Sequence, residues 1–333
     1  MDLSLEMFTN IPKVLNHHYK EGNFNWPYMA FFAVVHITAF MGIFKVADCK
    51  RESYLFFFIL WQLTGYGITC GAHRLWAHKS YEAHFIVRFL LMIGNSIAYQ
   101  GSIYSWAINH RIHHKYSETN ADPHNSTRGF FFAHIGWLLL KKHPDRVEVE
   151  SQLDYTDLWA DPLVRIQHKC DPFFAVPAIL SPCLVACYGW NESVSNSIFV
   201  VGCLRYCFVL HVTFLVNSAA HLWGDHPYDS KIAPAENPIV SYLAGGEGWH
   251  NWHHRYPFDY AASEFGISSQ FNPSKLLIDT FAFLGLVRNR KRATSSWRRY
   301  RERVATTTND TDADRCDATN TTDCIDTDAK KEM

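Results

Sequence analysis

The chain has 333 residues, of which 48% are hydrophobic, 15% aromatic and 19% charged, and its formal net charge is −1. The length allows one large domain or two small ones. The nine cysteines contain no Cys-x-x-Cys pair, which excludes the usual patterns of a disulfide framework or a zinc finger. The basic stretch 287–303 lies beside apolar segments and is interpreted as a surface that faces water or lipid headgroups, so no nucleic-acid partner is expected.

Four apolar segments approach the roughly 20 residues that a helix needs to cross a bilayer. They lie at about 28–47, 53–69, 173–190 and 195–216. The connections 48–52 and 191–194 are so short that the segments form two helical hairpins. Two further apolar runs, 83–100 and 129–140, are interpreted as interfacial or re-entrant helices that stay on one side of the membrane.

This reading predicts an all-α integral membrane protein with four transmembrane helices and a histidine-rich cap. Both termini and all histidine clusters then lie on one side. The segment 72–172 is rich in Lys and Arg, so the positive-inside rule places that side in the cytosol. The expected parts are an N-terminal segment 1–27, a first hairpin 28–71, cap segments 72–172 and 222–304 around a second hairpin 173–221, and a disordered acidic tail 305–333.

Three short histidine clusters lie near the ends of the apolar segments. They span 73–78, 110–114 and 250–254. The second and third repeat one spacing, i, i+3 and i+4, which places three imidazoles on one face of a helix. The first cluster has two histidines five positions apart, or about 140° apart on an ideal helix, so they share one metal only if the chain bends, or else serve two metals. One metal takes at most about six donors, so eight convergent histidines indicate two metals.

Other residues near the clusters are less diagnostic. His221 ends the fourth apolar segment, and Asn217 lies one turn earlier, where it could hold a metal-bound water; helix capping or packing is the alternative. The Glu-x-x-His pattern of soluble di-iron bundles is absent, and ligand type alone does not separate iron from zinc or copper. Eight other histidines are assigned to ordinary surface or hydrogen-bonding roles: His17, His18, His36, His84, His124, His134, His143 and His168.

Several motifs resemble one family. His-Arg-Leu-Trp-Ala-His, His-Arg-Ile-His-His-Lys, Asn-Ser-Ala-Ala-His-Leu-Trp-Gly, Gly-Glu-Gly-Trp-His-Asn-Trp-His-His and Glu-Thr-Asn-Ala-Asp-Pro-His-Asn-Ser resemble the membrane acyl-CoA Δ9 desaturases, the stearoyl-CoA desaturase family. The resemblance covers about residues 25–290. It implies a four-helix membrane stem under a cytosolic cap and two iron ions beside a kinked tunnel for a long-chain saturated acyl-CoA. It also implies O2 as co-substrate and electrons from cytochrome b5 and its NADH-dependent reductase.

The resemblance also implies roles for individual residues. The iron ligands would be His73, His78, His110, His113, His114, His221, His250, His253 and His254, with Asn217 acting through a water. The residues at the tunnel bend would be Gln100, Trp106 and Thr213, and the contacts to the coenzyme A phosphates would be Lys141 and Lys142. The pair Ile108-Asn109 departs from the usual Arg-Asp, and Gly101 stands where Asn is common.

Trp61 stands near the far end of the implied tunnel, where the family often has Tyr. A larger ring shortens the cavity, and each lost methylene contact changes affinity by roughly 0.8 kcal/mol. The sequence therefore favours palmitoyl-CoA over stearoyl-CoA. The final residues Lys330-Lys331-Glu-Met resemble a dilysine retrieval signal, which indicates the endoplasmic reticulum membrane.

Two alternatives stay open. One is a membrane di-iron lipid hydroxylase or a desaturase of other regiospecificity; the presence of His250 and the absence of His-Pro-Gly-Gly argue against a front-end desaturase. The other is a histidine-rich metal transporter or receptor. A transporter would carry ionisable residues along its spans, where this chain has only Arg205 and His211.

Overall fold

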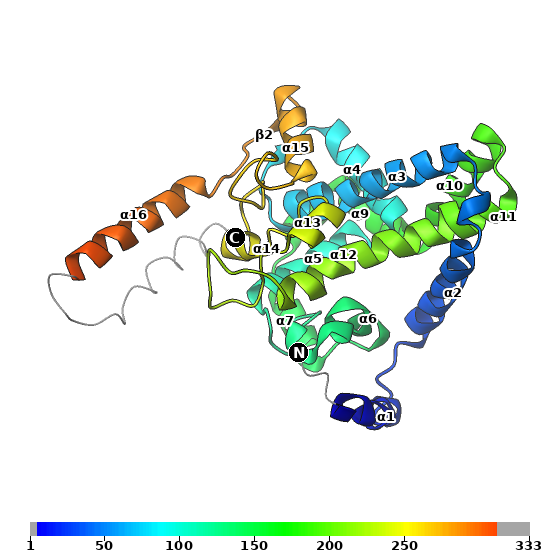
Figure 1. Ribbon diagram of the computed structural model, residues 1–333, viewed down its shortest axis with the longest axis horizontal. Helices are drawn as coiled ribbons and strands as arrows, with labels where there is room; N and C mark the ends of the chain where they lie inside the picture. The colour runs from blue at the N-terminus through cyan, green and yellow to red at the C-terminus, as the bar shows by residue number, and fades with distance from the viewer. Residues whose placement is uncertain (1–4, 312–333) are drawn as a thin grey trace.

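The computed structural model describes residues 5–311 and is built mainly from helices (Figure 1). The α-helices are α1 Leu5–Lys20, α2 Trp26–Ile43, α3 Arg51–Tyr66, α4 Phe85–Ala98, α5 Ile103–Lys115, α6 Trp137–Leu139, α7 Pro144–Gln152, α8 Thr156–Ala160, α9 Pro162–Cys170, α10 Ala175–Trp190, α11 Val194–Asn196, α12 Arg205–Leu222, α13 Pro238–Leu243, α14 His250–Arg255, α15 Pro273–Phe283 and α16 Thr294–Thr311. Three segments are π-helical, namely η2 Gly67–Ala77, η4 Phe132–Gly136 and η6 Ser197–Leu204. The 3-10 turns are η1 Val46–Asp48, η3 Ser126–Arg128 and η5 Asp171–Phe173.

The mostly helical prediction is confirmed, with one small departure. Strand β1 (Glu82–Ala83) pairs antiparallel with β2 (Val287–Arg288), so that Glu82 lies opposite Arg288. This pair ties the start of α4 to the end of α15, because His84 N also donates to Leu286 O at 2.8 Å. Two residues per strand are too few to form a sheet core, so the pair only holds together two segments that are distant in the sequence.

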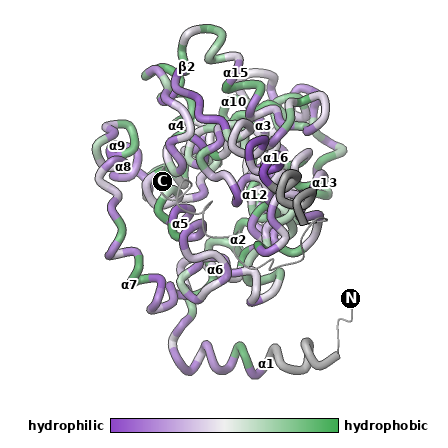
Figure 2. Tube along the Cα trace, turned by 90° about the vertical axis from the view of Figure 1, so that its left-hand side faces the viewer, coloured by the Kyte–Doolittle hydropathy of each residue, from purple (hydrophilic) through white to green (hydrophobic). Residues whose placement is uncertain are grey.

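Three helical stretches of the described chain are long and apolar enough to cross a membrane: Trp26–Ile43, Arg51–Ala77 and Val194–Leu222. They match the first, second and fourth expected spans, and their apolar residues are green in Figure 2. The third expected span forms α10, which has 16 residues and Pro182 in its interior, so it is shorter than expected. The run 83–100 forms the shorter helix α4, and the run 129–140 forms η4 and α6.

The two hairpin turns are joined to each other. Glu192 is buried and accepts hydrogen bonds from Lys50 N at 2.8 Å and from the Ser53 hydroxyl at 2.6 Å. Trp190 Nε1 donates to the same hydroxyl at 2.9 Å, and Asn196 Nδ2 donates to Asp48 O at 3.0 Å. Because both turns share one polar cluster, α3, α10 and η6 are anchored at the same end.

Arg205 is a charged residue within the last apolar stretch, and its hydrogen bonds show how it is accommodated there. Its side chain is fully buried, and its guanidinium donates to the carbonyl oxygens of Ala178 at 3.0 Å and Ile97 at 3.4 Å. Those carbonyls lie on α10 and α4. Arg205 therefore faces other helices, as the cost of a charge in an apolar segment requires.

Helix α16 extends away from the rest of the protein (Figure 1). It continues to Thr311, so residues 305–311, expected to begin a disordered tail, are helical. The rest of that tail, with Lys330 and Lys331, lies outside the described residues.

Candidate metal centre and adjoining cavity

Nine histidines meet where η2, α5, α12 and α14 converge. They form two groups, within each of which one nitrogen per ring lies within 4.8 Å of the others. The first group contains His73, His78, His110, His114 and His253, and the second contains His113, His221, His250 and His254. Neighbouring Nε2 atoms are 2.8 Å apart for His78 and His110 and 3.3 Å apart for His113 and His254.

The first histidine cluster owes its geometry to a π-helix. His78 N donates to His73 O at 3.1 Å, a bond that spans five residues. Such a turn brings positions five apart onto one face. The pair therefore enters one group together, which resolves the question that ideal α-helical geometry left open.

The second and third clusters divide their histidines between the groups. On α5, His110 and His114 join the first group, and His113 joins the second. On α14 the assignment is reversed, since His250 and His254 join the second group and His253 the first. The i, i+4 pair of each helix thus serves one group, and the intervening histidine serves the other.

The environment keeps several of these imidazoles neutral. Burial, reinforced by neighbouring histidines, holds the pKa of His110, His114 and His253 well below the ordinary value. The same causes act on His250 and His254. Neutral imidazole is the form that binds metal, so the donor set fits two transition-metal ions of nitrogen preference.

Carboxylates contact the Nδ1 atoms of some of these histidines and so orient their rings. The sequence did not lead us to predict these contacts. His113 Nδ1 lies 2.9 Å from Asp122 Oδ1, and His221 Nδ1 lies 2.9 Å from Glu118 Oε1. Burial alone would raise the pKa of Asp122, but the charge and hydrogen bond of His113 hold it well below its usual range. Carboxylates that fix the ring orientation of ligating histidines are typical of metal sites. Their signal was present in Glu118-Thr-Asn-Ala-Asp122.

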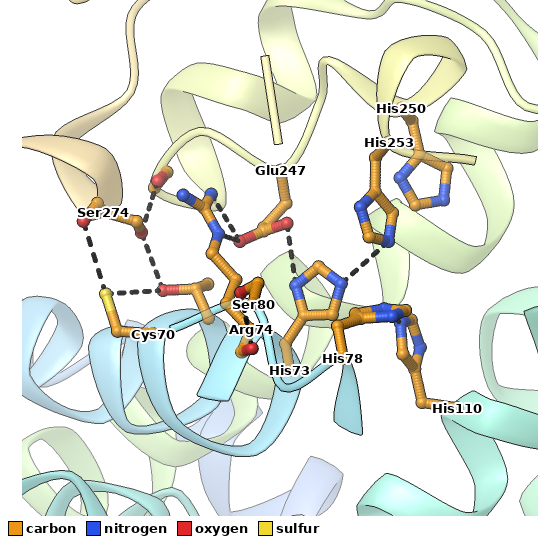
Figure 3. A network of polar contacts seen from close by, with 12 residues as sticks. Cys70, His73, Arg74, His78, Ser80, His110, Glu247, His250, His253 and Ser274 are labelled. Carbon is orange, nitrogen blue, oxygen red and sulfur yellow. Dashed lines mark hydrogen bonds and ion pairs between the residues drawn. The ribbon is translucent and has the colours of Figure 1, made fainter. Parts of the chain in front are cut away.

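Glu247 has the same role for the first group. Its Oε2 lies 3.0 Å from His73 Nδ1, and its Oε1 accepts from Arg74 NH2 at 2.8 Å. Figure 3 shows Glu247 between Arg74 and His73, with the His73 ring directed at His253. Arg74 is itself 1% exposed and also donates to the carbonyls of Tyr260 and Ala261. The orientation of His73 is therefore set by a fully buried ion pair.

One histidine assigned to an ordinary role lies at the site. His124 is buried, and its ring centroid is 4.3 Å from that of His113. Its Nδ1 has no hydrogen-bond partner among the described residues. By contrast, His84 and His143 cap the starts of α4 and α7, as an ordinary role predicts.

A cavity of about 380 Å³ adjoins the nine histidines. His73, His110 and His250 line it, and so does Trp61 on α3. Its walls include every residue expected at the tunnel bend and the position expected to hold a water: Gln100, Trp106, Thr213 and Asn217. Gln100 Nε2 donates to Thr213 Oγ1 at 3.1 Å, which joins the loop before α5 to α12.

A second cavity, of about 120 Å³, holds the two expected phosphate contacts, Lys141 and Lys142. Arg128 and Arg146 line it as well, and Trp137 lines both cavities. Arg146 is 5% exposed, and its Nε has no partner among the described residues. The departure at Asn109 is linked to this cavity, because Asn109 Oδ1 accepts a hydrogen bond from Arg146.

Glu236 contacts the backbone of the third histidine cluster and leads to a prediction about the pH dependence of stability. Its Oε1 accepts from Trp252 N at 2.9 Å, and burial raises the pKa of Glu236 from 4.5 to about 7. Because the folded state holds this proton more tightly, the stability that it contributes is present below pH 4.5 and is lost as the pH rises to about 7. At pH 8 the free energy of unfolding of Glu236→Gln should therefore exceed that of the wild type by roughly 2 kcal/mol, whereas at pH 5 the two proteins should unfold at about the same temperature. Thermal unfolding at both pH values checks this, and an equal gap at both would contradict it.

Comparison with known proteins agrees with this geometry. A family model described as fatty acid desaturase matches residues 53–265. Stearoyl-CoA desaturase 5 of Homo sapiens is 47% identical over 276 residues, 82% of this chain and 82% of that protein. The Delta(9)-fatty-acid desaturase fat-6 of Caenorhabditis elegans is 46% identical over 270 residues, 80% of this chain and 79% of that protein. The chain belongs to the fatty acid desaturase family.

Proposed function

We propose that this chain is an acyl-CoA Δ9 desaturase that introduces a cis double bond into a saturated fatty acyl-CoA, with palmitoyl-CoA favoured over stearoyl-CoA. The observation that carries the proposal is one cavity that is lined both by histidines of the two groups and by Trp61. The relatives named as stearoyl-CoA and Δ9 desaturases support the same reaction.

The nine histidines would hold two iron ions, five around the first and four around the second. Asn217 would complete the second through a water. The iron pair, with O2 and electrons from cytochrome b5 and its reductase, would supply the oxidant that an unactivated C–H bond requires. The carboxylates Glu118, Asp122 and Glu247 would keep the ligating rings in place.

The chain's own side chains would select which carbon reacts. The Trp106 ring stacks on His110 with centroids 4.9 Å apart, so it borders both the first group and the cavity. The Gln100–Thr213 hydrogen bond joins two other residues that line the cavity. These residues would hold the acyl chain in a bent conformation, with one carbon close to the metal site. That carbon would react in preference to the others because of its proximity.

The second cavity would receive the coenzyme A end of the substrate. Lys141 and Lys142 supply point charges for phosphate, and Arg146 supplies its Nε donor, which has no hydrogen-bond partner in the described part of the chain. Trp137, which lines both cavities, would stand between the nucleotide and the acyl chain. In this arrangement Arg146 and Asn109 would take the place of the Arg-Asp pair that the family usually has just before the second histidine cluster.

Glu150 forms ion pairs with two of these cationic side chains. Its carboxylate lies 2.8 Å from Lys142 Nζ and 3.2 Å from Arg146 NH2. Glu150→Gln should lower KM for acyl-CoA about two- to fivefold, the scale of a half-exposed ion pair, with kcat little changed. Initial rates against acyl-CoA concentration measure this, with Glu148→Gln as the control at an exposed neighbouring position. An unchanged or higher KM in Glu150→Gln would count against the phosphate site.

The same proposal implies a membrane topology for the chain. The three long apolar stretches together with α10 would make four spans, and the joined turns at 48–52 and 191–194 would lie on the far side from the histidines. The cap segments 72–172 and 222–304 and both termini would then be cytosolic. The membrane would be that of the endoplasmic reticulum.

The test is expression of the full chain in a yeast strain that lacks its own Δ9 desaturase. Gas chromatography of its fatty acids should show Δ9 monounsaturated products, with the 16-carbon product in excess. A hydroxylated fatty acid instead would establish the hydroxylase alternative, and a double bond at another carbon would overturn the Δ9 assignment.

A further inference from the structure

A third cluster of metal-binding side chains lies outside the nine-histidine site. It contains His36 on α2 together with Cys207 and His211 on α12, and these donors lie within 4.8 Å of one another. None of the three lines either described cavity. The two helices belong to stretches long enough to span a membrane, where ionisable residues are costly and mark function.

The imidazoles of this cluster form one continuous string of polar contacts. His36 Nδ1 lies 2.6 Å from Phe32 O, and His36 Nε2 lies 2.8 Å from His211 Nε2. His211 Nδ1 lies 2.9 Å from His134 Nε2. The string ends at Ser218, whose hydroxyl lies 2.8 Å from His134 Nδ1 and donates to Phe214 O at 2.9 Å.

The hydrogens of the string can be placed so that it holds a cation. The Phe32 carbonyl only accepts, so the hydrogen of neutral His36 is on Nδ1 and a lone pair remains on Nε2. When the Ser218 hydrogen is directed at Phe214 O, His134 donates from Nδ1 and accepts at Nε2, and His211 donates from Nδ1. The Nε2 lone pairs of His36 and His211 then face each other at 2.8 Å, an arrangement in which both can bind one cation. When Ser218 donates to His134 instead, the neutral string is fully hydrogen-bonded without a cation.

The nine-histidine groups have the same arrangement. There too, Nε2 atoms approach one another, as in His73 and His253 at 2.9 Å, while the Nδ1 atoms of His73, His113 and His221 are each held by a carboxylate. In the third cluster the acceptors for Nδ1 are a backbone carbonyl and His134. An acceptor on the far nitrogen is the usual support of a ligating histidine.

The donors select the kind of cation. Cys207 is buried, one helical turn before His211, and its sulfur is a soft ligand. No carboxylate belongs to this cluster among the residues that the structure describes. Two neutral imidazoles and one thiolate balance a single positive charge, whereas a divalent ion would leave a net charge in an apolar environment.

We propose that His36, Cys207 and His211 bind one soft monovalent metal ion, Cu+. The Cys207 thiol releases its proton to bulk water when the ion binds. His134 and Ser218 position His211 and do not contact the ion. The proposal does not rest on the proposed desaturase function, since it concerns donors outside that site.

The test measures Cu+ binding to the full-length, metal-loaded protein under anaerobic reducing conditions, in competition with a chromophoric Cu+ chelator. Wild type and the control Cys203→Ser should retain one Cu+ per chain beyond the metal of the nine histidines. Cys207→Ser and His211→Asn should bind it at least about tenfold more weakly. Iron content equal to that of the wild type shows that the variants are folded.

X-ray absorption at the copper edge gives an independent readout. It should show one sulfur and two imidazoles around copper in the wild type, and no sulfur in Cys207→Ser. The proposal is overturned if the chelator removes Cu+ equally from the wild type and Cys207→Ser, or if the wild-type copper has no sulfur neighbour.

Discussion

His113→Ala should reduce desaturation by more than about 10²-fold, because residues that only orient a metal ligand already cost about 10- to 100-fold. His113 belongs to the second histidine group and is 1% exposed. Its loss removes one of four imidazoles and leaves the buried Asp122 carboxylate without its partner. Iron content of the purified protein and gas chromatography of the products measure the two effects.

Matched variants separate a ligand from a merely buried ring. His84→Ala changes an exposed helix-capping histidine that lines neither cavity and should retain both activity and iron. Asp122→Asn keeps the shape of the supporting residue but not its charge, so its loss should fall between those of His84→Ala and His113→Ala. Full activity in His113→Ala would refute its assignment as a ligand.

Trp61→Ala should shift the preference from palmitoyl-CoA toward stearoyl-CoA by about tenfold. Two methylenes contribute roughly 1.6 kcal/mol at ~0.8 kcal/mol each, and 1.4 kcal/mol corresponds to a factor of ten. The indole is held in place by Phe208, with ring centroids 4.9 Å apart, and by Phe58 at 5.9 Å. It is therefore a firm wall, and its removal lengthens the cavity. Competition between the two acyl-CoAs in one assay gives the ratio directly.

Gly65→Ala is the opposite test, since Gly65 also lines the cavity and an added Cβ would meet no atom within 4 Å. The methyl group would fill space that the acyl chain uses, so this variant should discriminate more strongly against stearoyl-CoA. Trp26→Ala, which removes an exposed ring outside the cavity, is the control. If Trp61→Ala and Trp26→Ala show the same chain-length ratio, Trp61 does not set the end of the tunnel.

Much of the helical framework could be predicted from apolar length alone, because a span needs little more than a run of about 20 such residues. The extent of α10 could not, since Asp171–Phe173 form the 3-10 turn η5 and the helix begins only at Ala175. Likewise, residues 305–311 contain a single apolar residue, Ala305, yet they continue α16 as a helix.

At the site, spacing predicted the faces of α5 and α14 but not how their histidines divide. An ideal α-helix also separates His73 from His78, whereas η2 is a π-helix that brings them together. The contacts of Glu118 and Glu247 with histidines join positions more than 100 residues apart, which local patterns do not reveal. His36 and His211 are a similar case, because each is an isolated histidine in its own segment.

The crosswise division of histidines between α5 and α14 has a mechanical consequence. Each of these helices contributes histidines to both groups within a single turn, so on each helix the offset between the two groups is set by the helical rise of 1.5 Å per residue and not by loop conformation. One residue inserted within 110–114 would rotate part of that helix by about 100° and would disturb both groups at once. The two histidine groups are therefore coupled through the turns of α5 and α14.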